Sequence, residues 1–230
     1  MSTTLSQNHT PHPALAGCEA QIDALREVGA DFWRRNWSLG TSSNYSVVVN
    51  REPLELLITA SGKDKGRLQR ADFVRIGADG NPLAAGQQKS SAETMLHVVA
   101  AQQPDVGAVL HTHSIWGTIL SDYFHANGGF EITGYEMLKG LEGVTTHEYR
   151  GWVWVCENTQ HIPLLARQVQ DKLRDRDRPI KHGYLIRRHG LYTWGRDLDE
   201  ARRQIEIFEF LFECVARRLM LDGMLRPTAT

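Results

Sequence analysis

The stretch Val106-Gly107-Ala108-Val109-Leu110-His111-Thr112-His113-Ser114 joins a hydrophobic run to two histidines one residue apart. The run from Val106 to Leu110 is typical of a buried strand. Side chains i and i+2 of a strand point to the same face, so His111 and His113 can direct two imidazoles toward one point. Neutral imidazole is the commonest protein ligand for divalent transition metals. The stretch therefore predicts two of the ligands of a metal site.

The elements around this stretch indicate an α/β fold. Helical spacing of hydrophobic residues predicts helices over 18–37, 90–103, 114–124, 162–173 and 197–221. Strands are predicted over 47–49, 54–59, 73–76, 106–110, 149–155 and 184–186, a strand or turn over 191–195, and a short helix near 135–140. Strands cluster before residue 90 and alternate with helices after it, which favours one layered α/β domain with a mixed sheet. We expect this domain over 14–222, after a flexible arm (1–13) and before a tail (223–230).

The composition excludes several classes of protein. The 230 residues carry a formal net charge of −1 at pH 7, which gives no indication of a nucleic-acid or anionic-membrane partner. The three cysteines are far apart in the sequence and form no Cys-X-X-Cys pair, so neither a disulfide framework nor a thiolate zinc site is expected. The sequence contains no long uncharged apolar run and no signal-peptide pattern. These features predict a cytoplasmic enzyme or binding protein.

A third metal ligand has to come from another part of the chain. His189 is the best candidate, because it follows a predicted buried strand and precedes Gly190, which would permit a turn that exposes the imidazole. Three histidines with an open fourth position are typical of a catalytic zinc site. His97 and His125 have no partner at ligand spacing, whereas three histidines at strand or helix ends stay open as alternatives: His147, His161 and His182.

Two glutamates are candidates for proton transfer. Glu93 lies three residues after Ser90, which is also the spacing of a capping box at a helix start. Glu136 lies among Tyr135, Met137 and Leu138, where burial would raise its pKa toward the working pH of an enzyme. The alternative for Glu136 is an ordinary exposed glutamate on a helix.

Small polar residues gather in loops that could bind a phosphate monoester. They supply hydroxyl groups, one amide and backbone N–H groups, and comprise Asn44, Thr59, Ser61, Gly62, Ser90 and Ser91. Ser90 and Ser91 also lie at a predicted helix N-terminus, which favours an anion. Each of these residues taken alone is as well explained by a turn or a cap.

Five motifs in order make the sequence similar to a known family. They are Ser43-Asn44-Tyr45-Ser46, Thr59-Ala60-Ser61-Gly62, Ser90-Ser91-Ala92-Glu93, His111-Thr112-His113 and Arg188-His189-Gly190. Because of the order and spacing of these motifs, the sequence resembles the class II (zinc-dependent) aldolases over about residues 25–219. The resemblance implies an α/β/α domain with a mainly antiparallel sheet, assembled as a homotetramer with sites near subunit interfaces. It also implies one Zn²⁺ on His111, His113 and His189, and a sugar phosphate as substrate.

The resemblance further distinguishes two branches of this family. In the aldolase branch the residue matching Glu93 is the acid/base and can reach the metal. In the dehydratase branch, which acts on a methylthio-substituted ketose phosphate in methionine salvage, the residue matching Glu136 has that role. Segments 59–66, 135–140 and 157–160 look most like the dehydratase branch. Some of these dehydratases have cysteine where this chain has Glu93, so the role of Glu93 stays open.

Three other functions compete with this interpretation. A sugar-phosphate aldolase or epimerase would use the same metal and phosphate groups. A cupin-type oxygenase also uses His-X-His, but it requires a glutamate about four residues later, where this chain has Gly117 in a predicted helix. A catalytically silent interaction domain would not need three histidines and Glu136 together.

Overall fold

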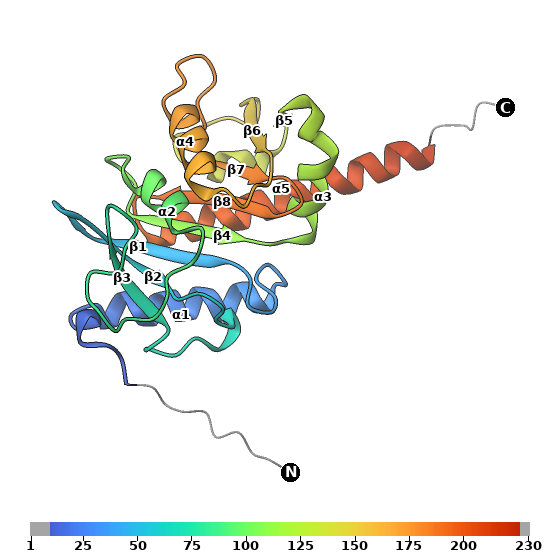
Figure 1. Cartoon of the computed structure of the whole chain (residues 1–230). Helices are drawn as coiled ribbons and strands as arrows, with labels where there is room; N and C mark the ends of the chain where they lie inside the picture. The colour runs from blue at the N-terminus through green and yellow to red at the C-terminus, as the bar shows by residue number, and fades with distance from the viewer. Residues whose placement is uncertain (1–9, 226–230) are drawn as a thin grey trace, which may run out of the picture.

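The computed structural model describes residues 10–225, which form one eight-stranded sheet between helices (Figure 1). The strand order is β3-β2-β1-β4-β8-β7-β6-β5. The strands are β1 (Asn44–Arg51), β2 (Leu54–Thr59), β3 (Phe73–Gly77), β4 (Ala108–Thr112), β5 (Gly129–Ile132), β6 (Gly151–Cys156), β7 (Gly183–Ile186) and β8 (Gly190–Gly195). Only β6 and β7 pair in parallel among these strands. The expected mixed, mainly antiparallel sheet is therefore confirmed, although the short edge strand β5 was not predicted.

Within residues 10–225, five α-helices cover the two faces of the sheet. They are α1 (Glu19–Arg34), α2 (Thr94–Ala101), α3 (Ile115–Phe124), α4 (Ile162–Leu173) and α5 (Leu198–Leu225). Buried residues of α1, α3 and α5 belong to one hydrophobic cluster, and those of α2 and α4 belong to a second cluster on the other face. Within residues 10–225, no helix has both the length and the hydrophobicity needed to cross a membrane.

Strand β4 lies in the middle of the sheet and is completely buried. Its neighbours β1 and β8 are both antiparallel to it, and their register places Asn44 and Tyr192 on either side of His111. Residues directly opposite one another on paired strands share a face. Strand pairing thus assembles an amide, an imidazole and a phenol from three distant parts of the chain.

Two helix boundaries differ from the predictions. Helix α2 begins at Thr94, not at Ser90, which instead forms an isolated bridge with Ala60. Glu93 is the residue before the first turn, and its side chain makes no capping hydrogen bond. The capping box that the spacing of Ser90 and Glu93 suggested is therefore not formed. Helix α5 continues to Leu225, beyond the predicted start of the tail. Residues 1–9 of the predicted arm and 226–230 of the tail lie outside the described residues.

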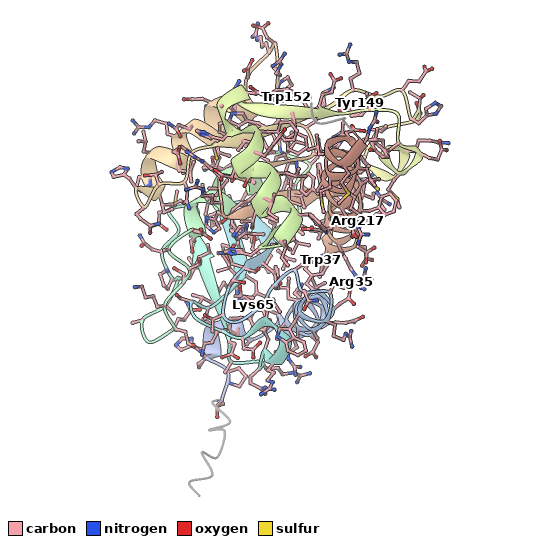
Figure 2. All side chains as sticks on the ribbon, turned by 90° about the vertical axis from the view of Figure 1, so that its right-hand side faces the viewer. Arg35, Trp37, Lys65, Tyr149, Trp152 and Arg217 are labelled. Atoms are coloured by element: carbon pink, nitrogen blue, oxygen red, sulfur yellow. The ribbon has the colours of Figure 1, made fainter. Side chains whose placement is uncertain are left out.

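The segment that follows α1 supports the second histidine of the motif. The Trp37 carbonyl accepts a hydrogen bond from the His113 backbone N–H at 2.8 Å. The Trp37 ring packs on Phe32 of α1, and the Arg35 guanidinium lies 5.1 Å from its centre (Figure 2). These contacts hold the chain in place where β4 ends.

Candidate active site

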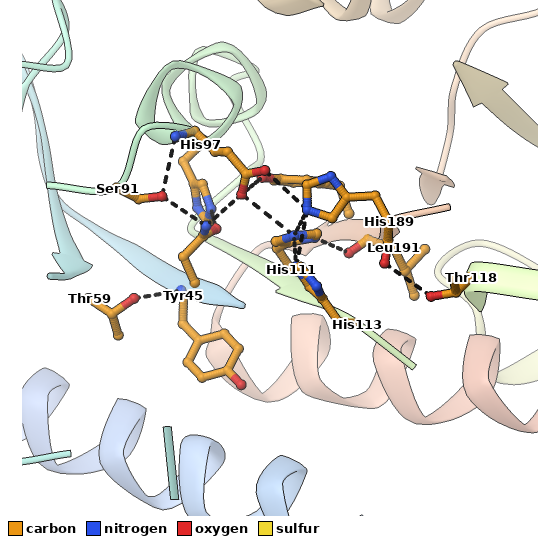
Figure 3. A network of polar contacts seen from close by, with 12 residues as sticks. Tyr45, Thr59, Ser91, His97, His111, His113, Thr118, His189 and Leu191 are labelled. Carbon is orange, nitrogen blue, oxygen red and sulfur yellow. Dashed lines mark hydrogen bonds and ion pairs between the residues drawn. The ribbon is translucent and has the colours of Figure 1, made fainter. Parts of the chain in front are cut away.

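His111, His113 and His189 converge at the end of β4 (Figure 3). Their Nε2 atoms are 2.7 Å (His111 to His113), 3.1 Å (His113 to His189) and 3.3 Å (His111 to His189) apart. His189 belongs to the turn between β7 and β8. The structure thus brings together the three histidines that were expected to meet. The alternatives His147, His161 and His182 make their contacts elsewhere.

The chemistry of these nitrogens fits a divalent transition metal. The Nδ1 of His111 lies 2.9 Å from the Leu191 carbonyl oxygen, which can only accept a hydrogen bond, so Nδ1 carries the proton and Nε2 keeps its lone pair. Burial, with smaller contributions from the other two histidines, places the pKa of His111 well below its usual range. Burial also lowers the pKa of His113 to about 3. Neutral imidazoles with converging lone pairs are the ligands that zinc prefers.

The backbone next to the histidines explains why glycine occupies position 190. A Cβ on Gly190 would overlap the Thr112 carbonyl oxygen of the paired strand, so glycine permits close approach rather than the expected turn. The turn itself uses Arg188, whose φ is +51°. The His189 carbonyl accepts a hydrogen bond from Thr118 Oγ1 at 3.1 Å, which ties this turn to α3.

Glu93 faces the three histidines instead of capping its helix. Its Oε1 lies 3.2 Å from His189 Nε2, and its Oε2 lies 3.6 Å from His111 Nε2. Asn44 Nδ2 and the Tyr192 hydroxyl donate hydrogen bonds to Oε2 at 2.9 and 3.0 Å. The carboxylate is therefore placed to contact either a metal held by the histidines or a substrate bound beside it.

A cavity of about 260 Å³ opens in front of His113, His189 and Glu93. Four of the predicted phosphate-binding residues line it: Asn44, Ser61, Gly62 and Ser91. Thr59 does not, because it is fully buried and its Oγ1 accepts a hydrogen bond from the Tyr45 backbone N–H. Ser90 is also absent from the lining, since it pairs with Ala60. Four of the six residues predicted to bind phosphate therefore line this cavity, and Thr59 and Ser90 do not.

Glu136 lies outside this cavity in the described chain. Its side chain is 72% exposed, and Lys139 Nζ donates a hydrogen bond to it at 2.6 Å. The expectation of a raised pKa was wrong, because the Lys139 ammonium lowers the pKa of Glu136. Glu136 instead borders an apolar hollow that also includes Met137 and Phe210 of α5.

Three residues of the site were not expected from the sequence. Tyr192 reaches Glu93, and His97 of α2 makes a hydrogen bond with Asn44. Ser43 lines the cavity, and its buried Oγ has no hydrogen-bond partner within the described residues. One signal was available for His97, because it lies four residues after Glu93 and so on the same side of the helix predicted over 90–103.

Comparisons with known proteins agree with this geometry. The family described as Class II Aldolase and Adducin N-terminal domain matches residues 23–216. The chain belongs to this family. It is a metal-dependent family, and the three-histidine group of this chain can hold a metal ion.

Several relatives that are 44–47% identical to this chain have the same name. A methylthioribulose-1-phosphate dehydratase of Marinobacter nauticus is 46% identical over 192 residues, which are 83% of this chain and 90% of the relative. The dehydratase of the same name from Pseudomonas fluorescens is 47% identical over 197 residues, which are 85% of this chain and 92% of the relative.

Solved structures of the family have the same fold. The L-fuculose-1-phosphate aldolase of Thermus thermophilus matches with a TM-score of 0.70 at 23% identity, over 89% of this chain and 98% of the aldolase. YgbL of Escherichia coli, a putative aldolase/epimerase/decarboxylase, matches with a TM-score of 0.71 at 21% identity, over 86% of this chain and 88% of YgbL. At these identities the likeness shows the fold alone.

Proposed function

We propose that this chain is a zinc-dependent lyase that removes water from 5-(methylthio)ribulose 1-phosphate, in methionine salvage. The product is 5-(methylthio)-2,3-dioxopentyl 1-phosphate. The observation that carries the proposal is the 46–47% identity to dehydratases of this name over more than four fifths of both chains. The cavity beside three converging imidazoles and a carboxylate supplies the chemistry that such a reaction needs. The cytoplasmic location stays a prediction.

We assign the metal to His111, His113 and His189. Zinc bound there would act as a Lewis acid that polarises the C2 carbonyl of the ketose and so acidifies the C3 proton. Glu93 stands at the remaining side of the histidine group, where it can be a fourth ligand, contact the substrate or exchange a proton.

The two ends of the substrate fit different parts of the cavity wall. The polar part, with Asn44, Ser61, Gly62 and Ser91, suits the phosphate, and the unpartnered Ser43 hydroxyl adds one group that can donate to it. The apolar part comes from Ile162, Leu165 and Ile186, and we place the methylthio tail there. Contacts at both ends hold C3 in a fixed position for proton removal.

The reaction needs one base and one acid. A carboxylate takes the C3 proton, and the electron pair forms an enediol with C2. The C4 hydroxyl then leaves as water after it receives a proton, the electrons form the C3–C4 double bond, and the enol tautomerises to the 2,3-diketone. We assign this proton transfer to Glu136, because the segment around it resembles the dehydratase branch, and we keep Glu93 as the second acid/base candidate.

Glu136 does not line the cavity of its own chain, so this assignment requires a second subunit. We propose a homotetramer in which Glu136 reaches the cavity of a neighbour. The apolar hollow next to Glu136, with Met137 and Phe210, suits contact with another copy, since both residues are more than one third exposed in the single chain (40% and 47%).

One assay tests the reaction. The zinc-loaded protein is incubated with 5-(methylthio)ribulose 1-phosphate, and the diketone is followed by its absorbance and by mass spectrometry. We expect loss of one water per substrate. Release of a two- or three-carbon fragment from a ketose phosphate, without diketone, would instead favour the aldolase alternative.

A subunit-mixing experiment tests the location of Glu136. The Glu136→Gln and His189→Ala variants are each expected to be inactive as homo-oligomers. If Glu136 acts in a neighbouring subunit, oligomers reassembled from both variants regain part of the activity, because some cavities receive intact residues from each chain. Unchanged inactivity of the mixture, with mixed oligomers shown by mass spectrometry, would contradict this arrangement. A mixture of His189→Ala with His113→Ala is the control and should stay inactive.

A further inference from the structure

His97 is a fully buried histidine that the proposed reaction does not use. It lies on α2, one turn after Glu93, and does not line the cavity. Its Nδ1 lies 2.8 Å from Ser46 Oγ, and its Nε2 is hydrogen-bonded to Asn44 Oδ1. Asn44 and Ser46 are two residues apart on β1, so both face α2 from the same side of the sheet.

The hydrogen bonds of Asn44 determine which ring nitrogen of His97 carries the proton. Asn44 Nδ2 donates to Glu93 Oε2 at 2.9 Å and to Ser91 Oγ at 3.1 Å. The amide oxygen of Asn44 therefore points to His97, and because this oxygen only accepts, His97 Nε2 must be the donor. Nδ1 is then the acceptor, and the Ser46 hydroxyl donates to it.

This direction of donation matters because a side-chain amide can rotate by 180°. In the rotated state the Asn44 oxygen would face the Glu93 carboxylate, and the amide nitrogen would face the N–H of His97, so both contacts would be repulsive. The His97 N–H needs an acceptor, so it holds the amide in the orientation that presents the amide nitrogen to Glu93.

We propose that His97 is a positioning residue whose Nε2–H bond fixes the Asn44 amide and thereby keeps the Glu93 carboxylate directed at the metal-binding histidines. This role rests on the proposed dehydratase function, in which Glu93 touches metal or substrate. The chain of contacts runs from Ser46 through His97 and Asn44 to Glu93, and each member is buried or nearly so.

The kinetic test compares two substitutions of His97. His97→Phe fills a similar volume without a donor, and kcat should fall about 10- to 100-fold, as expected for a lost hydrogen bond that orients a charged group. KM and zinc content should change less than about threefold. His97→Gln places an amide N–H near the position of Nε2, and it should recover most of the lost kcat.

A second variant separates positioning from general destabilisation. Val98→Ala removes buried volume from the next position of α2 without touching Asn44, so it should lower the melting temperature and leave kcat per folded protein unchanged. The proposal is wrong if His97→Phe keeps kcat within twofold of the parent enzyme. It is equally wrong if His97→Gln is as impaired as His97→Phe.

The third measurement does not depend on activity. Nitrogen NMR of the zinc-loaded protein labelled at its imidazoles should show His97 with a protonated Nε2 and an unprotonated Nδ1, and the reverse tautomer would overturn the proposal. The assignment comes from loss of this signal in His97→Gln. If the unmodified protein fails to dehydrate the ketose phosphate, the proposed function fails, and the tautomer still decides whether His97 orients Asn44.

Discussion

The Tyr192 ring stacks on the His111 imidazole, with ring centres 4.0 Å apart and planes inclined by 13°. The Tyr192 hydroxyl reaches past this ring and donates to Glu93 Oε2 at 3.0 Å. One side chain of β8 therefore packs against a predicted metal ligand and holds the carboxylate that faces it. Tyr184 stacks in turn on the other side of Tyr192, with ring centres 5.2 Å apart.

Removal of the Tyr192 hydroxyl should impair catalysis without loss of the fold. Tyr192→Phe keeps the stacked ring but deletes the hydrogen bond to Glu93, so kcat should fall about 10-fold, the usual effect of one hydrogen bond to a charged group. The matched control is Tyr184→Phe, because the Tyr184 hydroxyl is buried and has no partner within the described residues. Steady-state kinetics measures kcat for both variants. If Tyr192→Phe and Tyr184→Phe lose the same activity, the hydrogen bond from Tyr192 to Glu93 has no role in catalysis.

Loss of a histidine from the converging group should release the metal. His189→Ala should lower zinc affinity by more than about 100-fold, because even residues that only orient a ligand affect affinity by 10- to 100-fold. Zinc per subunit, measured by mass spectrometry after dialysis against a weak chelator, checks this. His12→Asn, which changes a histidine outside the cavity, should keep the full metal content. If His189→Ala keeps one zinc ion per subunit, the third ligand must be another histidine.

Glu209 of α5 should make the stability of this protein depend on pH. Burial raises the pKa of Glu209 to about 7, and its Oε2 has no hydrogen-bond partner within the described residues. The folded state therefore holds a proton that the unfolded chain releases near pH 4.5, so the free energy of unfolding falls as pH rises from about 4.5 to about 7.

Glu209→Gln lacks this titration. Relative to the parent protein, the variant should gain up to about 3 kcal/mol of stability between pH 4 and pH 8. Urea unfolding at several pH values measures the difference, and the titration of the histidines cancels because both proteins share it. A stability difference between Glu209→Gln and the parent protein that stays constant over this pH range would contradict the buried acid.

Ile162 should contribute to recognition of the methylthio tail. Ile162→Ala removes apolar surface from the cavity wall, so kcat/KM for 5-(methylthio)ribulose 1-phosphate should fall about 10-fold. The value for ribulose 1-phosphate, which has a hydroxyl at that end, should change little. Leu164→Ala alters an exposed residue of the same helix and serves as the control. If Ile162→Ala loses the same factor in kcat/KM for both substrates, the methylthio tail does not contact Ile162.

Local sequence patterns predicted most of the secondary structure. Hydrophobic spacing identified β4, α3, α4 and α5 to within a few residues, because it reports burial of one face of an element. The capping-box prediction failed at Ser90 and Glu93, because Asn44, Tyr192 and the histidines bind the carboxylate that would have capped α2. Edge strand β5 was missed because four residues beside a loop give too short a pattern.

The sequence by itself determined the kind of chemistry and the family. His111-Thr112-His113 offers two imidazoles on one face whatever the rest of the chain does, since the alternation of a strand is a local property. Five ordered motifs were enough to indicate the class II aldolase fold, which the comparisons bear out.

Only the tertiary structure decided which residues meet. Strand pairing of β1, β4 and β8 brings Asn44, His111 and Tyr192 into one row, and the β7–β8 turn adds His189. The same structure places Glu136 away from the cavity of its own chain. The physical reason is that these contacts join residues separated by about 50 to 150 positions, so they depend on register and on the packing of whole layers, which no local periodicity encodes.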